Sequence, residues 1–393
     1  MCCTPKPSEI IVCQMQMMTR RRESGEMLNI VDAKVAAYGG DAGDAYIGEI
    51  VVVELVTEGG LTGTGFASAP RGVGHIFRDL IANVLLPQII GQNAMLHRDL
   101  WDKMFRTIPR RGGEGIVRVC ISALDFAIWD LKARASGATL AQLIGGHRDK
   151  VPTYINCAHH MPPDALAERA ASYVRDGHRA LKIRGARSHV TLQEADARVA
   201  AVREAIGEDV LLMVDVNGTW DADTAIQQLR KWERHNLFWL EEPVQPEDFA
   251  GYRAVRERAG GVHIAGGEQH TSLHEYQALI GFDGIDIAQP NAAICGGITE
   301  WMRIHDHAVA NGRIVSPWNL QPIHIHLACG LQSVKWLEYF KLDNALLGIQ
   351  TLLFSGPRIS ERVEADGVYL EPPEAPGLGL EIDPEAAEKY RLA

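Results

Sequence analysis

Three carboxylates recur at an almost constant interval in the middle of the chain. Asp215, Glu241 and Glu268 each follow a short apolar run, and the steps from 215 to 241 and from 241 to 268 are 26 and 27 residues. One strand plus one helix has about this length, so successive parallel strands would bring one acid each to the same rim of a barrel. Carboxylates without histidine or cysteine partners favour Mg²⁺ over Zn²⁺. The spacing therefore predicts a magnesium site.

Glu242, directly beside Glu241, is the alternative ligand at the second position. Adjacent residues of a strand face opposite ways, so only one of the two acids should point to the barrel axis. The regular spacing of the three carboxylates favours Glu241.

Two cationic side chains lie on the preceding predicted strand. Lys182 and Arg184 are two residues apart, so both project to the same side and would face the metal. A metal with a cationic pair can bind a substrate carboxylate and stabilise the enediolate that forms when the α-proton leaves. We predict that both residues are catalytic; the alternative is that they only neutralise the acids.

The elements that position these residues alternate regularly after Gly145-Gly146, with strand-like apolar runs between amphipathic helical runs. We expect strands near 152–157, 179–184, 210–215, 236–241, 262–267, 284–288, 313–316 and 333–338. We expect helices near 163–176, 190–206, 221–234, 246–258, 272–281, 297–312 and 322–331. Eight strands with about seven helices predict an α/β fold, a (β/α)7β TIM-like barrel with its active site at the C-terminal strand ends.

The chain before the barrel has a different order of elements. A strand near 30–35 and a hairpin of 50–57 with 62–67 precede helices at 75–92, 97–107 and 116–136. Strands followed by helices predict an α+β domain. We therefore divide the chain into four parts: an irregular N-terminal extension at 1–27, the α+β domain at 28–145, the barrel at 146–358, and a C-terminal segment at 359–393 that folds back on the first domain.

Composition narrows the function classes. The 393 residues carry a formal net charge of −11, which argues against a nucleic-acid binder. The longest apolar runs stay below the roughly 20 residues that span a bilayer. Seven scattered cysteines and the lack of a secretory pattern at the first residues predict a cytoplasmic location. We expect the partner to be a small-molecule carboxylate, with neither nucleic acid nor a membrane involved.

In combination, the motifs resemble the enolase superfamily, in its mandelate racemase/muconate lactonizing enzyme-like branch. The motifs are Lys182-x-Arg184, Val214-Asp215-x-Asn217, Leu240-Glu241-Glu242-Pro243, Gly266-Gly267-Glu268 and the turn at 290–299. The resemblance spans Ile30 to Glu338. It implies that the three acids hold Mg²⁺, that Asn217 lines the substrate pocket, and that Glu338 hydrogen-bonds the substrate carboxylate. It also implies that the N-terminal domain is a capping domain, with closing loops near 38–48 and 68–74, and that the protein is a homo-oligomer.

The chain departs from the pattern of that branch at its proton-transfer residues. The branch normally carries Lys-x-Lys, whose second lysine is a general base, and Arg184 takes that place here. Arginine stays protonated, so it suits a carboxylate clamp better than a base. The branch also carries a histidine after the seventh strand and an aspartate after the sixth. Trp318 and Asn291 stand at these two places, and we predict that both line the substrate pocket.

The motifs therefore do not identify the general base. Lys182 is the first candidate, because crowding by Arg184 and the metal would depress its pKa. His159, His160 and His270 follow predicted strand ends and are further candidates, but each fits a polar residue at the rim of the substrate pocket better than a base, and we predict that His159 and His270 bind substrate there.

We predict a Mg²⁺-dependent lyase that abstracts the α-proton of a hydroxy carboxylate through an enediolate, as an acid-sugar dehydratase does. Dehydration can use one group as base and then acid on a single face, whereas racemisation needs a base on each face. A racemase, epimerase or cycloisomerase of the same superfamily is the alternative. A metal-dependent carboxylate-binding protein without proton transfer is the second alternative.

Overall fold

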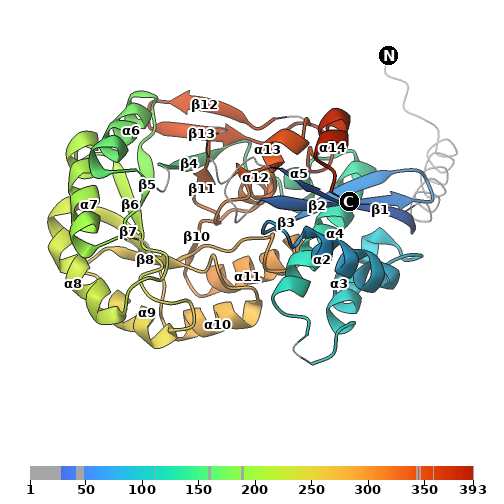
Figure 1. Ribbon diagram of the computed structural model, residues 1–393, viewed down its shortest axis with the longest axis horizontal. Coiled ribbons are helices and arrows are strands. Elements are labelled where there is room, and N and C mark those ends of the chain that lie inside the picture. The colour runs from blue at the N-terminus through green and yellow to red at the C-terminus, as the bar shows by residue number, and fades with distance from the viewer. Residues whose placement is uncertain are drawn as a thin grey trace, which may run out of the picture.

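The computed structural model describes residues 28–40, 48–110, 112–157, 161–186, 190–341, 344, 347–356 and 358–392. The chain forms a small domain with a three-stranded sheet and a larger domain whose strands are surrounded by helices (Figure 1). The predicted extension at 1–27 and most of the predicted loop at 38–48 lie outside the described residues.

The small domain is an antiparallel sheet covered by helices. Its elements are β1 (Ile30–Gly39), β2 (Glu49–Thr57), β3 (Thr62–Ala69), α2 (Gly74–Leu80), α3 (His97–Arg106) and α4 (Ile116–Ser136). Helix α4 lies against β3 at a glycine, because a Cβ at Gly65 would be only 2.0 Å from the carbonyl oxygen of Ala123. The helix predicted at 75–92 ends as an α-helix at Leu80 and continues in π and 3₁₀ turns up to Gln88. Pro87 lacks the N–H that a regular helix requires there.

The large domain is a parallel barrel, as predicted. Its strands are β4 (Val151–Asn156), β5 (Ala180–Arg184), β6 (Leu211–Asp215), β7 (Leu237–Glu241), β8 (His263–Gly266), β9 (Ile287–Ala288), β10 (Ile314–Val315) and β11 (Leu337–Tyr339). The helices between them are α6 (Pro163–Arg175), α7 (Leu192–Ile206), α8 (Ala222–Trp232), α9 (Phe249–Arg256), α10 (Leu273–Gly281), α11 (Ile298–Ala310) and α12 (Gln321–Gly330). The short helix α5 (Leu140–Ile144) connects the two domains.

The barrel closes between its last and first strands. Strands β4 to β10 pair in sequence order, and β11 pairs in parallel with β4. A bridge between Val315 and Val334 joins the β10 side to the segment that leads into β11. The described strands and helices therefore confirm the (β/α)7β TIM-like barrel with an N-terminal α+β domain.

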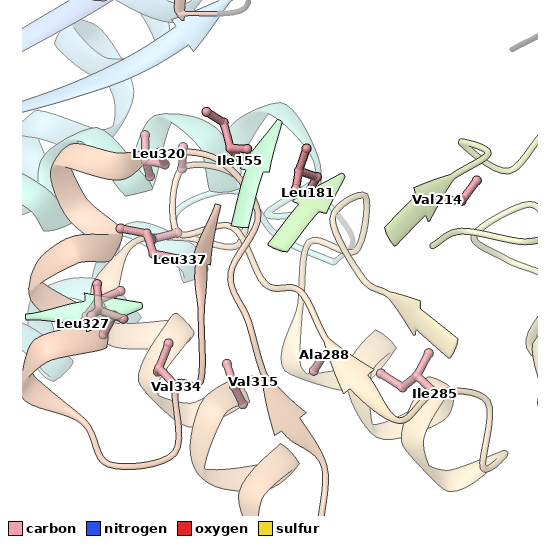
Figure 2. Close-up of a cluster of buried hydrophobic side chains, with 14 of the residues drawn as sticks. Ile155, Leu181, Val214, Ile285, Ala288, Val315, Leu320, Leu327, Val334 and Leu337 are labelled. Atoms are coloured by element: carbon pink, nitrogen blue, oxygen red, sulfur yellow. The ribbon is translucent and has the colours of Figure 1, made fainter. Parts of the chain in front are cut away.

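Alternation along the strands separates the barrel lumen from the helix layer. Leu181 and Val214 point outward into the core under the helices, and Figure 2 shows them together with Val315 and with Leu327 of α12. The opposite faces of the same strands carry the inward residues. A separate apolar cluster of Tyr154, Ala180, Met213, Trp239, Ala265, Ile287 and Trp336 fills the lumen. Polar residues further along each strand lie toward the C-terminal ends.

The C-terminal segment contacts both domains. Strands β12 (Ser360–Glu364) and β13 (Gly367–Glu371) form a hairpin, and β13 pairs with the start of β4. Beyond it, the chain passes α14 (Pro384–Tyr390), and the amide of Leu392 donates to the carbonyl of Ala37 in β1 at 2.8 Å. The predicted boundaries of the four parts remain a proposal.

The loop at 68–74, predicted to close over the substrate, is held on two sides. The Glu49 carboxylate accepts the amides of Gly72 and Gly74, both at 2.6 Å. The Ser68 hydroxyl accepts from Gln350 Nε2 at 3.0 Å, and Gln350 belongs to the segment that follows β11. The loop at 68–74 is therefore tied to the start of β2 and to the segment that follows β11. The described helices are all too short or too polar to cross a membrane.

Candidate active site

The three predicted metal ligands meet at the C-terminal end of the barrel. Asp215 and Glu241 are the last residues of β6 and β7, where they stand opposite each other in the strand register. Glu268 follows the end of β8. One ligand atom from each of the three lies within 4.8 Å of the others, and all three side chains are buried. The structure thus brings together the acids that the sequence spacing singled out.

The charge of this cluster favours a divalent cation. Five carboxylates are buried together, from Asp215, Glu241, Glu242, Glu268 and Glu338. Lys182 and Arg184 are the cations in contact with them, so the described groups leave a formal charge of −3 when every carboxylate is ionised. Burial raises the pKa of Asp215, and burial followed by the repulsion of Glu242 and Asp215 raises the pKa of Glu268 well above its usual value. A divalent cation would relieve this repulsion.

The donor set itself fits Mg²⁺. Among the described residues, the buried Glu268 Oε2 accepts no hydrogen bond, which leaves a lone pair available to an ion. An all-oxygen set of three carboxylates is the type of site that Mg²⁺ occupies with water or substrate as the remaining ligands. Asp215, Glu241 and Glu268 would therefore hold the metal.

Glu241 is oriented by three donors. Lys182 Nζ lies 2.6 Å from its Oε1, while Trp239 Nε1 and Gln289 Nε2 donate to its Oε2 at 3.1 Å and 2.8 Å. These contacts come from β5, from β7 itself and from the residue after β9. Neighbours on three strands thus fix its carboxylate toward the lumen, which supports Glu241 as the ligand.

Glu242 lies beside the triad, where two amide side chains bind its carboxylate. Its backbone has a left-handed φ of 46°. Its two carboxylate oxygens each accept a hydrogen bond from Gln269 Nε2, Oε1 at 3.1 Å and Oε2 at 2.9 Å. Asn217 Nδ2 donates to Glu242 Oε2 at 3.1 Å and to Glu268 Oε1 at 3.4 Å. Burial, followed by repulsion from Asp215, raises the pKa of Glu242 to about 8. Asn217 also donates its backbone N–H to Asp215 Oδ1 at 2.9 Å, so it orients two of the predicted ligands.

Lys182 and Arg184 both face the acids, as their spacing predicts. Lys182 Nζ lies 2.6 Å from Glu241 Oε1 and 2.8 Å from Glu338 Oε1, and Arg184 Nη1 lies 2.7 Å from Asp215 Oδ2. Burial alone lowers the pKa of Lys182, but the neighbouring carboxylates, first Glu241 and then Glu338, raise it well above its usual value. Without a cation on the triad, Lys182 is therefore protonated.

Glu338 closes the site from the last strand. Its fully buried carboxylate accepts from Asn156 Nδ2 at 2.9 Å, from Lys182 Nζ at 2.8 Å and from the backbone N–H of Asn319 at 3.0 Å. Three donors from three different segments hold this carboxylate in one orientation.

The other predicted pocket residues are more scattered. Asn291 is buried after β9, where its Oδ1 accepts the amide of Ala293 at 2.8 Å and shapes the turn. Trp318 is half-buried in the connection between β10 and α12. The ring of His270 packs against those of Phe249 and Tyr276, on the helices behind the rim. The structure therefore does not bring His270 to the acid cluster. His159 and His160 lie outside the described residues.

Sequence reasoning missed several groups that contact the site, among them Asn156, Gln289 and the Asn319 amide. Strand parity could have identified the first, because Asn156 stands opposite Lys182 in the register of β4 and β5. Gln289 lies two residues beyond the inward-facing Ile287, so the same rule applies to it. Strand parity could not have identified the Asn319 amide, because the direction of this N–H depends on a left-handed backbone with φ of 52°.

Two family models match the chain. Residues 45–145 match the one described as mandelate racemase / muconate lactonizing enzyme, N-terminal domain, and residues 165–387 match the one described as enolase C-terminal domain-like. Together these matches cover both domains of the fold.

Among known proteins, the chain is similar to L-talarate/galactarate dehydratase of Salmonella typhimurium, with 33% identity over 78% of this chain and 77% of that protein. It is 28% identical to 3,6-anhydro-alpha-L-galactonate cycloisomerase of Streptomyces coelicolor, over 85% and 89% of the two chains. A solved structure of L-talarate dehydratase from Polaromonas sp. JS666, complexed with Mg and L-glucarate, superposes with a TM-score of 0.81 and 31% identity. That match covers 93% of this chain and 98% of the other.

Proposed function

Because the chain belongs to the enolase superfamily, in its mandelate racemase/muconate lactonizing enzyme branch, we propose that it is a Mg²⁺-dependent acid-sugar dehydratase. The observation that carries the proposal is the buried Asp215–Glu241–Glu268 triad with Lys182 and Arg184 directly beside it. The similar L-talarate dehydratase is complexed with Mg and L-glucarate, which supports a small hydroxy carboxylate as substrate here.

The site residues divide the work of the reaction. When bound, Mg²⁺ supplies Lewis-acid stabilisation of an enediolate oxygen. Arg184 has a permanent charge and the bidentate geometry to clamp the substrate carboxylate. Glu338 can hydrogen-bond that carboxylate through one proton shared between the two groups. Asn217 keeps Asp215 and Glu268 in place. Pre-organised charges of this kind lower the barrier because they need no rearrangement during the reaction.

Lys182 is the residue that we assign to proton transfer. A divalent cation held by Glu241 and Asp215 would offset part of the negative charge that keeps Lys182 protonated and would thereby lower its pKa. Its neutral Nζ can then take the α-proton, and the C–H bonding pair forms the enediolate. Departure of the β-hydroxyl consumes that electron pair, and the proton from Lys182 leaves with the hydroxyl as water. The remaining enol tautomerises to a 2-keto-3-deoxy acid.

A one-faced mechanism suits this site better than racemisation. Trp318 and Asn291 stand where the family pattern has a histidine and an aspartate, and neither side chain is a general base. A cycloisomerase is the second candidate, since a similar protein carries that name and the reaction also begins at an acidic proton. A carboxylate-binding protein without proton transfer is the third candidate, supported by the two short contacts that hold Lys182 in its charged form.

The decisive experiment is to incubate the protein with Mg²⁺ and a library of acid sugars in D₂O. We expect a 2-keto product from at least one mono- or dicarboxylic sugar acid, together with deuterium at its C3. Deuterium exchange or isomerisation without loss of water would favour the epimerase or cycloisomerase. If no sugar acid in the library reacts or exchanges, although calorimetry shows carboxylate binding, the third candidate replaces the dehydratase.

We further propose that the protein is a cytoplasmic homo-oligomer, as the sequence predicts. Light scattering of the purified chain measures the assembly directly, and a monomeric mass at working concentration would contradict it.

A further inference from the structure

A histidine outside the predicted site connects two of the loops that surround it. His324 lies in the first turns of α12 and is completely buried. On one side of its ring is the turn after β9, and on the other is the turn after β10. These are the positions at which Asn291 and Trp318 replace the residues expected from the family pattern.

The hydrogen bonds of His324 define its tautomer. The backbone N–H of Ala292 donates to Nε2 at 3.1 Å, so Nε2 carries no proton. Nδ1 lies 2.6 Å from the carbonyl oxygen of Asn319, an acceptor, so Nδ1 carries the proton and donates. The ring is therefore neutral and uses both nitrogens, and burial lowers the pKa of His324 to about 3.

The backbone of Asn319 connects His324 to the active site. Asn319 and Leu320 both have left-handed φ angles, of 52° and 53°, which are unfavourable for residues with a Cβ. This conformation directs the Asn319 carbonyl to His324 and the Asn319 N–H to Glu338 Oε2, at 3.0 Å. The other oxygen of Glu338 binds Lys182. A continuous set of contacts thus runs from Ala292 through His324, Asn319 and Glu338 to Lys182.

We propose that His324 is a positioning residue for this reaction: it holds the strained Asn319–Leu320 turn so that the Asn319 amide orients Glu338 beside Lys182. The inference rests on the proposed dehydratase function for its kinetic consequence. His324 makes no contact with substrate in this role and exchanges no proton. Its effect is to keep Glu338 from rotating when substrate and metal change the charges around Lys182.

The same helix provides a matched control. His326 is also completely buried and neutral, and its Nε2 bonds to the carbonyl of Leu378 in the C-terminal segment, at 3.1 Å. His324→Leu and His326→Leu therefore remove equally buried imidazoles from one helix, and only the first removes the link to Asn319. We expect His324→Leu to lower kcat at least tenfold with Mg²⁺ affinity within twofold of wild type, and His326→Leu to leave kcat within twofold. Equal kcat for the two variants would overturn the proposal.

A second measurement is independent of activity. Hydrogen exchange resolved to single residues should show the Asn319 amide protected in the wild type, and at least tenfold less protected in His324→Leu but not in His326→Leu. Unchanged protection of Asn319 would overturn the proposal even if kcat fell. His324→Gln, which can still donate and accept, should recover part of the protection and serves as the test if His324→Leu does not fold. If the wild type dehydrates no sugar acid, the proposed function fails, and exchange at Asn319 still decides the role of His324.

Discussion

At the scale of single residues, the site is governed by an excess of buried negative charge. Asp215, Glu241 and Glu268 approach one another within 4.8 Å, and Lys182 with Arg184 offset only part of their charge. Such a cluster is costly until a cation joins it, because buried like charges repel strongly. Metal binding, ligand orientation and the protonation of Lys182 are therefore consequences of one charge balance.

Removing one ligand tests the metal assignment. We expect Asp215→Asn to weaken Mg²⁺ binding at least tenfold, because an amide replaces an anionic oxygen that faces the other two acids. Isothermal titration calorimetry with MgCl₂ measures this, with Asp223→Asn, an exposed residue at the start of α8, as the control. Equal affinities for the two variants would refute Asp215 as a ligand.

Replacing the proposed proton carrier tests the mechanism. Lys182→Met keeps an unbranched chain of similar length and removes the amine, so we expect α-proton exchange to fall by about 10³-fold or more, within the range attributed to general acid–base catalysis. Exchange in D₂O measured by NMR gives the rate, and the exposed Lys231→Met is the control. Exchange that continues at the wild-type rate would show that another group is the base.

At the scale of elements, the strand ends place the chemistry and α12 supports it. Parity along β5, β6 and β7 sends Lys182, Asp215 and Glu241 into the lumen, while Leu181 and Val214 enter the helix layer. Helix α12 holds two neutral histidines, and each connects to a backbone carbonyl of another segment. The helix thereby fastens both the turn after β10 and the C-terminal segment to the barrel.

These histidines make stability depend on pH. Burial lowers the pKa of His326 to about 4, below the ordinary value of 6.5, so the unfolded chain binds the proton more readily. Its contribution is complete above pH 6.5 and is lost as the pH falls toward 4, at about 1.4 kcal/mol per pH unit. Urea unfolding between pH 4.5 and 7 should show a shallower slope for His326→Gln than for wild type. Parallel slopes would mean that folding does not change the pKa of His326.

At the scale of the whole molecule, one helix of the small domain anchors the barrel. Ser122, Asp125 and Trp129 of α4 bond to Gly296 and Thr299 in the turn that begins α11. Asp125 takes the place of a capping side chain, because the N-cap residue of α11 is a glycine. The turn that begins with Asn291 is thus held by the other domain.

The close approach at Gly297 makes this interface testable. A Cβ there would lie 2.3 Å from Asp125 Oδ2, and φ is 92°. We expect Gly297→Ala to lower the free energy of unfolding by about 1–3 kcal/mol more than Gly312→Ala, where φ is also positive at 69° but the surrounding space is open. Urea denaturation of both variants measures the difference. Equal losses would mean that the interface relaxes around the methyl group.

The sequence alone determined the barrel, the order of its strands and the identity of the three acids, because these depend on local periodicity and on a repeat length set by one strand and one helix. It also located Lys182, Arg184 and Glu338 at strand ends. Asn156 and Gln289 follow the same alternation of inward and outward side chains along the strands, so their position in the site could also have been predicted.

Only the tertiary structure decided which residues form hydrogen bonds and ion pairs with the buried acids. The left-handed backbone at Glu242 and Asn319, the separation of His270 from the site, and the links of His324 depend on which segments meet in space. Hydrogen bonds between residues distant in the chain leave no periodic signal, because their geometry is set by packing and not by local propensity. The metal triad could therefore be predicted from the sequence, whereas the hydrogen-bond network that orients Lys182 and Glu338 could not.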